Sequence, residues 1–431
     1  IDIIIDRTSD LTIKFSWVHP NLFYLFLVRL FLDQASYCPD TASAYNKWVF
    51  LVSKRDPVII SGGGPVAMVL ALALYREGVP FTILEQLDEP FVDQRAASHH
   101  PPTISMLNEL GLAEHMIAEG LKSPVYRFHD RVNHETIAEF DLGDLKEEVE
   151  FPYVLQYEQY KLVRKVIALF GHDPAFDVRF SHTVKNFEQF NDHILVNVQC
   201  SDGSIEKFRG SYLVGCDGGR SAVRKGAEIN FVGFTYPEKF IKIGTYFDLT
   251  AHDNRIAIRN YFSHPDEWCN LFKVRGEPDK PDIWRFVVPM RVNETEEEAK
   301  SEQAMQARLK RFFERDQNYE IAYANVYTVS QRVADTFNKG RVLLAGDSAH
   351  VNNPIGGMGL NGGIHDAINL AKKLSAVWKG DSDPDLLNLY TRQRHKASTD
   401  FTQAQTIANK KQLEERDPIM RKKRLDEMRA I

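Results

Sequence analysis

Two glycine-rich segments have the residue types and spacing needed to hold phosphate groups. In the first, residues 61–67 read SGGGPVA and directly follow a short apolar run. This is a G-x-G-x-x-A pattern, in which Gly62 permits a tight turn and Gly64 lets a pyrophosphate approach the backbone, while Ala67 keeps helix and strand close. Glu85 lies 23 residues beyond Gly62 (85 − 62), where a ribose-binding carboxylate is expected. The segment therefore predicts a dinucleotide site.

The second segment, residues 341–374, combines an acid with a longer glycine loop. Its sequence is RVLLAGDSAHVNNPIGGMGLNGGIHDAINLAKKL, in which a buried strand is expected to end at Gly346-Asp347. Apolar residues at helical spacing then predict a helix that begins after Asn361. A bare loop lets a ligand approach the backbone, and a helix N-terminus offers N–H groups and partial positive charge. This pattern suits a large, flat ligand.

A third strand with an acidic end lies between these two segments. Residues 211–224 read SYLVGCDGGRSAVR, so an apolar strand is expected to end near Asp217 and to be followed by a helix. Short, fully apolar strands that alternate with helices are typical of an α/β fold with a buried sheet.

The bulk composition restricts the class of protein. The chain has 431 residues, of which 43% are hydrophobic and 26% charged, and its formal net charge of −6 argues against a general nucleic-acid binder. The four cysteines lie far apart and show no metal-ligand spacing, so we expect neither a metal nor a disulfide framework. They fit a reducing compartment, and hence a cytoplasmic location.

Residues 1–55 differ from the rest of the chain. The sequence does not begin with Met, and Leu22 to Leu32 is apolar except for Arg29. This run is too short to span a bilayer, which needs about 20 residues, and it has no basic n-region or clear cleavage site. We expect an N-terminal extension of doubtful origin, with a membrane-surface anchor as the alternative.

The middle of the chain is rich in aromatic residues. Phe231 to Pro289 is strand-like and predicts an antiparallel sheet with one face packed and one facing a pocket. Each aromatic side chain there could line that pocket or belong to ordinary sheet core. Residues 294–315 predict a solvated amphipathic helix.

Taken in order, the motifs GGGPVA with Glu85, CDGGRSAVR, and GDSAH…P…GG.GLN resemble those of a known family. They are similar to the FAD-dependent aromatic hydroxylases of the p-hydroxybenzoate hydroxylase family, the group A flavoprotein monooxygenases. The resemblance covers the chain from Pro57 onward and implies an α/β architecture. A Rossmann-like FAD-binding domain of the glutathione-reductase type would be interrupted by a β-sheet substrate domain and followed by a helical C-terminal part. The implied ranges are 56–122, 153–230 and 335–384 for the FAD-binding domain, 123–152 and 231–334 for the substrate domain, and 385–431 for the helical segment.

The resemblance also implies which residues hold FAD. Glu85 would bind the ADP half, Asp347 the ribityl chain, and Asp217 lies in a segment credited with both FAD and NAD(P)H roles. Backbone N–H groups of the last motif would stabilise the reduced, anionic flavin. Asn353 stands where some members of the family have proline. The expected FAD contacts are Gly62, Gly64, Pro65, Ala67, Glu85, Arg95, Gln156, Asp217, Gly346, Asp347, Pro354, Gly357, Gly359, Leu360 and Asn361.

The implied reaction is hydroxylation of a phenolic or related aromatic or heteroaromatic compound. NADH or NADPH would reduce FAD, and O₂ would then give a C4a-hydroperoxyflavin. The chain's tail resembles that of compact members such as the 3-(3-hydroxyphenyl)propionate hydroxylases. The expected partners are a small aromatic substrate and O₂, with no nucleic acid and no membrane, and a homodimer is an open possibility.

Other readings of the same residues are a flavin-dependent halogenase, a flavin reductase, or a degenerate FAD-fold binding protein. The halogenase signature W-x-W-x-I-P is missing from the sequence. For the hydroxylase, a phenol proton must be removed and a substrate anchored. The candidates are His100, Tyr246 and Tyr261 for the base, and Arg259, Arg285 and Trp284 for substrate binding.

Overall fold

The strands that carry the three motifs lie side by side in one sheet of the computed structural model, which describes residues 55–92 and 94–431. The strand order is β18-β19-β12-β1-β2-β8, and β19, β12, β1 and β2 run parallel. These four strands are buried along their whole length, which explains why their sequences are continuous apolar runs. The strands are β1 (Val58–Ser61), β2 (Phe81–Leu84), β8 (Asp177–Arg179), β12 (Tyr212–Gly215), β18 (Asn338–Lys339) and β19 (Val342–Leu344).

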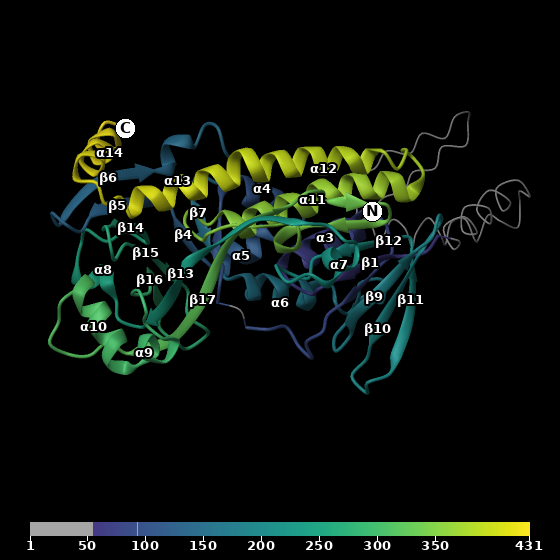
Figure 1. Cartoon of the computed structure of the whole chain (residues 1–431), viewed down its shortest axis with the longest axis horizontal. Coiled ribbons are helices and arrows are strands. Elements are labelled where there is room, and N and C mark those ends of the chain that lie inside the picture. Colours follow the sequence, from purple (N-terminus) through teal and green to yellow (C-terminus); the bar gives the residue numbers. More distant parts are fainter. Residues whose placement is uncertain (1–54, 93) are drawn as a thin grey trace, which may run out of the picture. The chain divides into compact units, whose positions relative to one another are not determined.

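Two helices from opposite ends of the sequence pack against each other beside this sheet (Figure 1). They are α3 (Pro65–Arg76), which follows the first motif, and α11 (Met358–Lys379), which follows the last. A Cβ atom on Gly363 would lie 2.6 Å from Val66 Cγ2, and one on Gly346 would lie 2.9 Å from it. These glycines therefore let the first and last motifs touch.

The remaining elements around the six-stranded sheet include two small antiparallel sheets. One has the order β11-β10-β9, in which β10 and β11 form a hairpin, and the other has the order β3-β7-β4. The elements are β3 (Ser98–His99), α4 (Pro101–Glu109), α5 (Ala113–Glu119), β4 (Leu121–Ser123), β7 (Val154–Gln156), α6 (Gln159–Phe170), β9 (Thr183–Gln189), β10 (Ile194–Gln199), β11 (Ile205–Gly210), α7 (Ala222–Gly226) and η2 (Gly346–Ser348).

The aromatic middle of the chain forms the expected large sheet. Its order is β20-β17-β13-β16-β15-β14-β5-β6, and only the β14–β5 pair is parallel. The mixed α/β architecture predicted from the sequence is therefore confirmed. The elements of this region are β5 (Val125–Asp130), β6 (Glu135–Asp141), η1 (Leu142–Leu145), β13 (Phe231–Thr245), α8 (Leu249–His252), β14 (Arg259–Ser263), β15 (Cys269–Val274), β16 (Ile283–Pro289), β17 (Ile321–Ala334) and β20 (His350–Val351).

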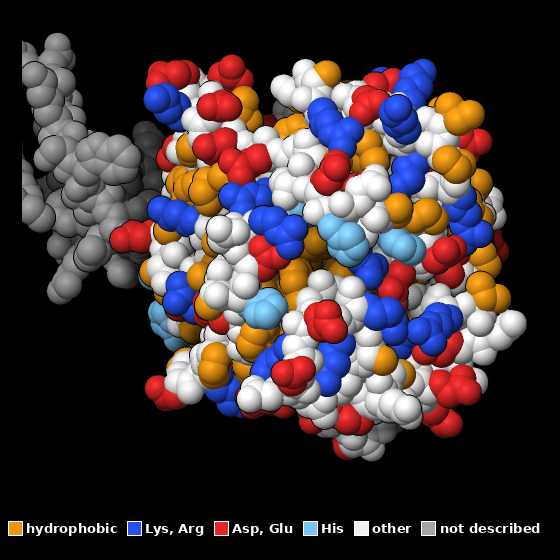
Figure 2. All heavy atoms as spheres, turned by 90° about the vertical axis from the view of Figure 1, so that its left-hand side faces the viewer, with side chains coloured by type: hydrophobic (Ala, Val, Ile, Leu, Met, Phe, Trp, Pro, Cys, Tyr) orange, Lys and Arg blue, Asp and Glu red, His pale blue; other side chains and the backbone are white. Residues whose placement is uncertain are grey.

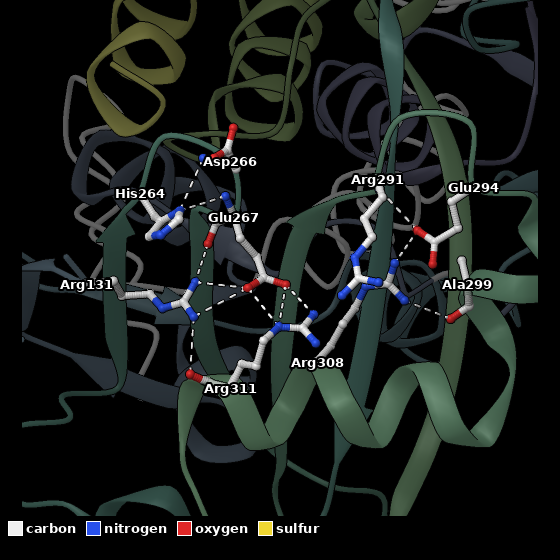
Figure 3. Close-up of polar contacts among 9 residues, drawn as sticks. All are labelled: Arg131, His264, Asp266, Glu267, Arg291, Glu294, Ala299, Arg308 and Arg311. Carbon is white, nitrogen blue, oxygen red and sulfur yellow. Dashed lines mark hydrogen bonds and ion pairs between the residues drawn. The ribbon is translucent and has the colours of Figure 1, made fainter. Parts of the chain in front are cut away.

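One face of this sheet packs against a helical segment. The predicted helix over residues 294–315 is two helices, α9 (Glu296–Lys300) and α10 (Glu302–Phe312), because Ser301 ends the first and caps the second. Figure 3 shows the hydrogen bonds and ion pairs between charged side chains of α10 and of the sheet region. The Glu267 carboxylate accepts from Arg311 Nε at 3.0 Å and from Arg131 at 3.5 Å, and Arg131 lies over the Phe312 ring.

The C-terminal segment forms a long helical rod followed by one further helix (Figure 1). Helix α12 (Leu386–Lys396), the π-helix η3 (Ala397–Gln403) and α13 (Ala404–Leu413) follow one another without a break, and α14 (Pro418–Arg429) comes last. Helix α12 contacts β18 of the six-stranded sheet, while α13 contacts β14 of the eight-stranded sheet. The rod thus connects the two sheets.

No helix within the described residues is long and apolar enough to cross a membrane. The apolar run from Leu22 to Leu32, and with it our expectations for the N-terminal extension, lies outside the described residues. Over the face shown in Figure 2, acidic and basic side chains are interspersed.

Candidate active site

A cavity of about 1450 Å³ lies where the carboxyl ends of the parallel strands meet the eight-stranded sheet. Single small-molecule sites typically measure about 300–1,000 Å³. The cavity therefore has room for a dinucleotide and a second, smaller molecule. Many expected site residues line it, namely Gly62, Gly64, Pro65, Glu85, Arg95, Asp217, Asp347, Pro354, Gly357, Gly359 and Leu360, together with Arg259 and Tyr261.

The first motif leaves an open space in front of a helix N-terminus. Gly62 has a φ of +99°, and a Cβ atom there would lie 2.5 Å from the Cys216 carbonyl oxygen, so only glycine fits. Gly64 is the N-cap of α3, and no described side chain caps the helix. Apart from its chain neighbours, no atom of the described residues lies within 4 Å of a Cβ built on Gly64. The Glu85 carboxylate accepts the Gly63 N–H at 2.5 Å. These features fit a diphosphate at the helix end with a ribose beside Glu85.

Asp217 offers a buried acceptor to the cavity. Its Oδ2 accepts the N–H groups of Ala222 at 2.8 Å and Val223 at 3.2 Å, at the start of α7. Its Oδ1 is buried and has no hydrogen-bond partner among the described residues. Burial raises the pKa of this carboxyl group. A ligand rich in hydroxyl groups would satisfy the remaining oxygen.

A buried ionic cluster holds the turn that presents Asp347. The Gly346 N–H donates to Asp366 Oδ2 at 3.0 Å, and the same carboxylate pairs with His350 Nε2 at 2.7 Å and Arg394 Nε at 2.6 Å. Burial disfavours the ionised form of Asp366, but His350 and Arg394 outweigh it and lower the pKa of the carboxyl group. Asp347 itself is exposed at the cavity.

Helix α11 begins earlier than the sequence suggested. We expected it to begin after Asn361, but it begins at Met358, because Gly357 adopts the left-handed conformation (φ +69°) and ends the loop. The Gly357 N–H donates to the Pro354 carbonyl at 3.0 Å. Only the N–H groups of Met358, Gly359 and Leu360 therefore remain for a ligand, since that of Asn361 falls within the helix's own hydrogen-bond ladder.

The backbone N–H groups of Gly357 and Asn361, which we expected to face FAD, are thus engaged within the loop and the helix. The Asn361 side chain instead ties the helix to the segment before α4. Its Oδ1 accepts the His100 N–H at 2.9 Å, and its Nδ2 donates to the carbonyls of Ser98 at 2.8 Å and Gly357 at 2.6 Å.

Several predicted residues do not line the cavity. Ala67 is fully buried on α3, as its predicted packing role requires. Gln156 is also fully buried, and its Oε1 accepts from Ser98 Oγ at 3.0 Å, so it lies behind a residue that does line the cavity. The non-lining residues are Ala67, Gln156, Gly346, Asn361, His100, Tyr246, Arg285 and Trp284.

Two of the three candidate bases lose support. Burial, followed by the charge of Arg259, lowers the pKa of His100 to about 3, so this imidazole is a poor proton acceptor at neutral pH. Tyr246 lies just after β13, outside the cavity lining, where its N–H donates to the Glu320 carbonyl at 3.2 Å. Tyr261 does line the cavity.

Two of the three substrate-binding candidates are committed elsewhere. Arg285 is fully buried, pairs with Glu158 and donates to the Gln94 carbonyl at 3.1 Å. Trp284 is an odd number of positions from Val287, which lines the cavity, so its side chain points to the opposite face of β16. It packs there with Ile243 in a separate core. Register, which the sequence does not reveal, puts Trp284 on the other face of the sheet. Arg285 is two positions from Val287 and shares its face, but its charge is already paired with Glu158.

One wall of the cavity is a row of side chains across four neighbouring strands. Lys242 on β13 pairs with Val287 on β16, which pairs with Asn270 on β15, which pairs with Tyr261 on β14. All four line the cavity. Lys242 and Asn270 are buried polar residues that we had not singled out. Strand periodicity alone would have found them only once the inward face was known.

Arg259 carries a buried positive charge beside this row. Its side chain is 7% exposed, its Nη2 donates to the Tyr261 hydroxyl at 2.9 Å, and it lies 5.6 Å from the Tyr126 ring. Among residues 55–92 and 94–431, no carboxylate lies within ion-pair distance of it. A buried guanidinium without a counter-ion favours an anion in the cavity.

Comparisons with known proteins agree with this geometry. A family model described as FAD binding domain matches residues 55–405. Para-nitrophenol 4-monooxygenase of Pseudomonas sp. (strain WBC-3) is 30% identical over 373 residues, covering 85% of this chain and 89% of that protein. 6-Hydroxy-3-succinoylpyridine 3-monooxygenase HspB of Pseudomonas putida (strain DSM 28022 / S16) is 30% identical over 378 residues, covering 85% of this chain and 91% of that protein.

The fold agrees as well. The crystal structure of p-nitrophenol 4-monooxygenase PnpA from Pseudomonas putida DLL-E4 has a TM-score of 0.81 and 28% identity, and the match covers 87% of this chain and 93% of that one. The chain therefore belongs to the FAD binding domain family, and within it to the FAD-dependent aromatic hydroxylases.

Proposed function

We propose that the chain uses NAD(P)H and O₂ to hydroxylate a small phenol that carries a negative charge, bound against Arg259 and Tyr261. The observation that carries this proposal is the buried guanidinium of Arg259, which lines the cavity without a carboxylate partner among the described residues. A substrate anion would supply the missing counter-charge in a site that excludes water.

The glycine motifs are proposed to hold FAD along the opposite side of the cavity. Bound FAD would supply the electron transfer from NAD(P)H and the transfer of oxygen to the ring. The start of α3 would bind the diphosphate, Glu85 a ribose, and Asp347 the ribityl chain. The first N–H groups of α11 would stabilise negative charge on the flavin ring of FAD. The domain ranges, the homodimer and the cytoplasmic location stay predictions.

The chemistry of the relatives' named substrates supports an anionic phenol. A para-nitrophenol and a 6-hydroxy-3-succinoylpyridine both combine a hydroxylated ring with a nitro or carboxylate group. The Arg259 charge would also favour a deprotonated ring hydroxyl, which makes the ring more electron-rich. The Tyr261 hydroxyl, already oriented by Arg259, and the Asn270 amide can hydrogen-bond the same substrate.

The test measures NADH and NADPH oxidation by the FAD-loaded full chain with a panel of phenols, and identifies products by mass. We expect 4-nitrophenol and phenolic carboxylates to raise the rate and to gain one oxygen atom, and 4-methylphenol to be a poor substrate. Arg259→Met should lower kcat/KM for the charged phenols by about a hundredfold, as expected for a buried charged contact, and that for 4-methylphenol far less.

The matched control is Arg127→Met, because Arg127 lies on β5 in the same sheet but outside the cavity lining and pairs with Glu139. This substitution should leave kcat/KM unchanged both for the charged phenols and for 4-methylphenol. Equal losses for charged and neutral phenols in Arg259→Met would refute the anionic-substrate proposal. Oxidation of NAD(P)H without any hydroxylated product would favour a reductase, and a halogenated product would favour a halogenase.

A further inference from the structure

Three metal-ligating side chains meet at one end of the small β9-β10-β11 sheet, outside the cavity. His182 directly precedes β9, Cys200 directly follows β10, and Glu206 lies on β11. The register brings them together, because Gln199 pairs with both Thr183 and Ile205. One donor atom from each of the three residues lies within 4.8 Å of the other two.

We propose that His182, Cys200 and Glu206 bind a zinc-type divalent transition-metal ion, with water in the fourth position. Imidazole nitrogen, thiolate sulfur and carboxylate oxygen are all zinc ligands, and three protein ligands plus water make a tetrahedral site. Donor atoms around tetrahedral zinc lie about 3.5 Å apart, so side-chain rotation would close the site. Binding would release the Cys200 thiol proton to solvent.

The His182 ring is already oriented as a ligand would be. Its Nδ1 lies 2.6 Å from the Phe180 carbonyl oxygen. A carbonyl can only accept, so Nδ1 carries the hydrogen and Nε2 keeps its lone pair for a metal. The ring also packs edge-on against Phe208 at 6.1 Å. Its backbone N–H donates to the Glu85 carbonyl at 2.8 Å, which fixes the start of the ligand segment.

The other two ligands place a thiol and a carboxylate together. A divalent cation would neutralise the thiolate and the carboxylate at once. The Cys200 backbone is held in place, because its N–H donates to the Ser204 carbonyl at 2.9 Å and its carbonyl accepts from Gly203 at 3.0 Å.

Such an ion would join all three strands beside the segment that carries Glu85. The ligands are 18 and 6 residues apart (200 − 182 and 206 − 200), which matches no zinc motif. The expectation of no metal rested on the spacing of the four cysteines, whereas strand pairing is what brings His182, Cys200 and Glu206 together.

The test is calorimetric titration of Zn²⁺ into the FAD-loaded full chain, after chelator treatment and in the presence of a phosphine reductant. We expect one Zn²⁺ per chain. Removing a residue that only hydrogen-bonds a metal ligand typically weakens metal binding by about ten- to a hundredfold. Cys200→Ser changes a ligand itself, so it should weaken Zn²⁺ binding by more than about a hundredfold, and Glu206→Gln should weaken it by about tenfold. Co²⁺ should give a thiolate charge-transfer band in the difference spectrum that Cys200→Ser lacks.

The matched control is Cys38→Ser, which removes a thiol from the N-terminal extension and should leave Zn²⁺ binding unchanged. FAD content and melting temperature without zinc establish that each variant is folded. The proposal is overturned if the parent chain binds no Zn²⁺, if Cys200→Ser and Glu206→Gln both bind it like the parent, or if Cys38→Ser abolishes binding.

Discussion

Gly357 and Gly359 lie two positions apart, yet glycine is needed at each for a different physical reason. Gly357 has a φ of +69°, and a Cβ atom there would lie 3.2 Å from Ser98 Cβ. Gly359 has no such backbone requirement, and the nearest atom to its Cβ would be Asn352 Oδ1 at an ordinary 3.5 Å. A side chain at Gly359 would fit the protein but extend into the cavity. The fold therefore requires glycine at position 357, and we predict that FAD binding requires it at position 359.

The substitution Gly359→Val tests this distinction. The free energy of unfolding of the FAD-free chain should change by no more than about 1 kcal/mol, since valine and glycine differ little in a helix. FAD affinity should fall by about a hundredfold, equivalent to about 2.7 kcal/mol, because the new side chain occupies the flavin's place. Fluorescence titration of FAD and denaturant unfolding measure the two quantities.

Gly357→Val is the companion variant, and it should destabilise the FAD-free chain by about 1–3 kcal/mol because a β-branched residue disfavours positive φ. Normal FAD binding by Gly359→Val would show that the cofactor does not approach the start of α11.

The cofactor loop between β20 and α11 is held from outside by other elements. Asn353 is fully buried; its N–H donates to Gln331 Oε1 on β17 at 3.0 Å, and its Nδ2 donates to the Thr406 carbonyl on α13 at 2.9 Å. Its Oδ1 accepts the Ile355 N–H at 3.1 Å. A proline here would lack the N–H that Gln331 accepts. This departure from some family members therefore has a structural role that links the C-terminal helices to the FAD site.

We expect Asn353→Ala to weaken FAD binding through the loop that Asn353 holds, since Asn353 itself would not contact FAD. Buried partners left unsatisfied should cost about 1–3 kcal/mol of stability, and a looser loop should lower FAD affinity by about tenfold. Asn369→Ala, which removes a more exposed hydrogen bond to Gln393 on α12, serves as the control and should stay within about 0.5 kcal/mol of the parent. Equal FAD affinity in both variants would show that α13 does not support the loop.

These elements also show what the sequence could and could not predict. Strand–acid–glycine–helix order is a local property, so the cofactor motifs around Gly62, Glu85 and Asp347 were recognisable and line one cavity. Substrate candidates depend on register and on contacts between residues far apart in the sequence. Arg259 and Arg285 both pair with Phe272 and so share one face of the large sheet, yet only Arg259 lines the cavity. Arg285 is engaged by Glu158, a contact that no local pattern reveals.

Across the whole molecule, buried or half-buried histidines form contacts in different parts of the fold. Burial lowers the pKa of His99, His129 and His365 to about 4, and that of His100 to about 3. They sit in different places: His99 bonds to the Tyr157 carbonyl, His365 to Thr103, and His129 lies in the eight-stranded sheet. In each case the folded state disfavours the charged imidazole.

This pattern predicts how stability depends on pH. The pKa of a histidine is near 6.5 in the unfolded chain and lower here in the folded chain, so unfolding takes up protons below about pH 6.5. The free energy of unfolding should be highest above that pH and fall as the pH decreases towards 4. Each fully engaged histidine should contribute a slope of up to about 1.4 kcal/mol per pH unit.

The variant His129→Gln isolates one of these contributions far from the FAD motifs. His129 is 5% exposed, its Nε2 donates to Asn260 Oδ1 at 3.2 Å, and its ring stacks on Phe262. Glutamine can keep a polar contact but does not titrate, so the slope between pH 6.5 and 5 should become shallower by about 1 kcal/mol per pH unit. Denaturant unfolding at several pH values measures it, with His115→Gln at an exposed site on α5 as the control. If His129→Gln and the parent chain gave parallel curves, the pKa of His129 would have to be the same in the folded and the unfolded chain.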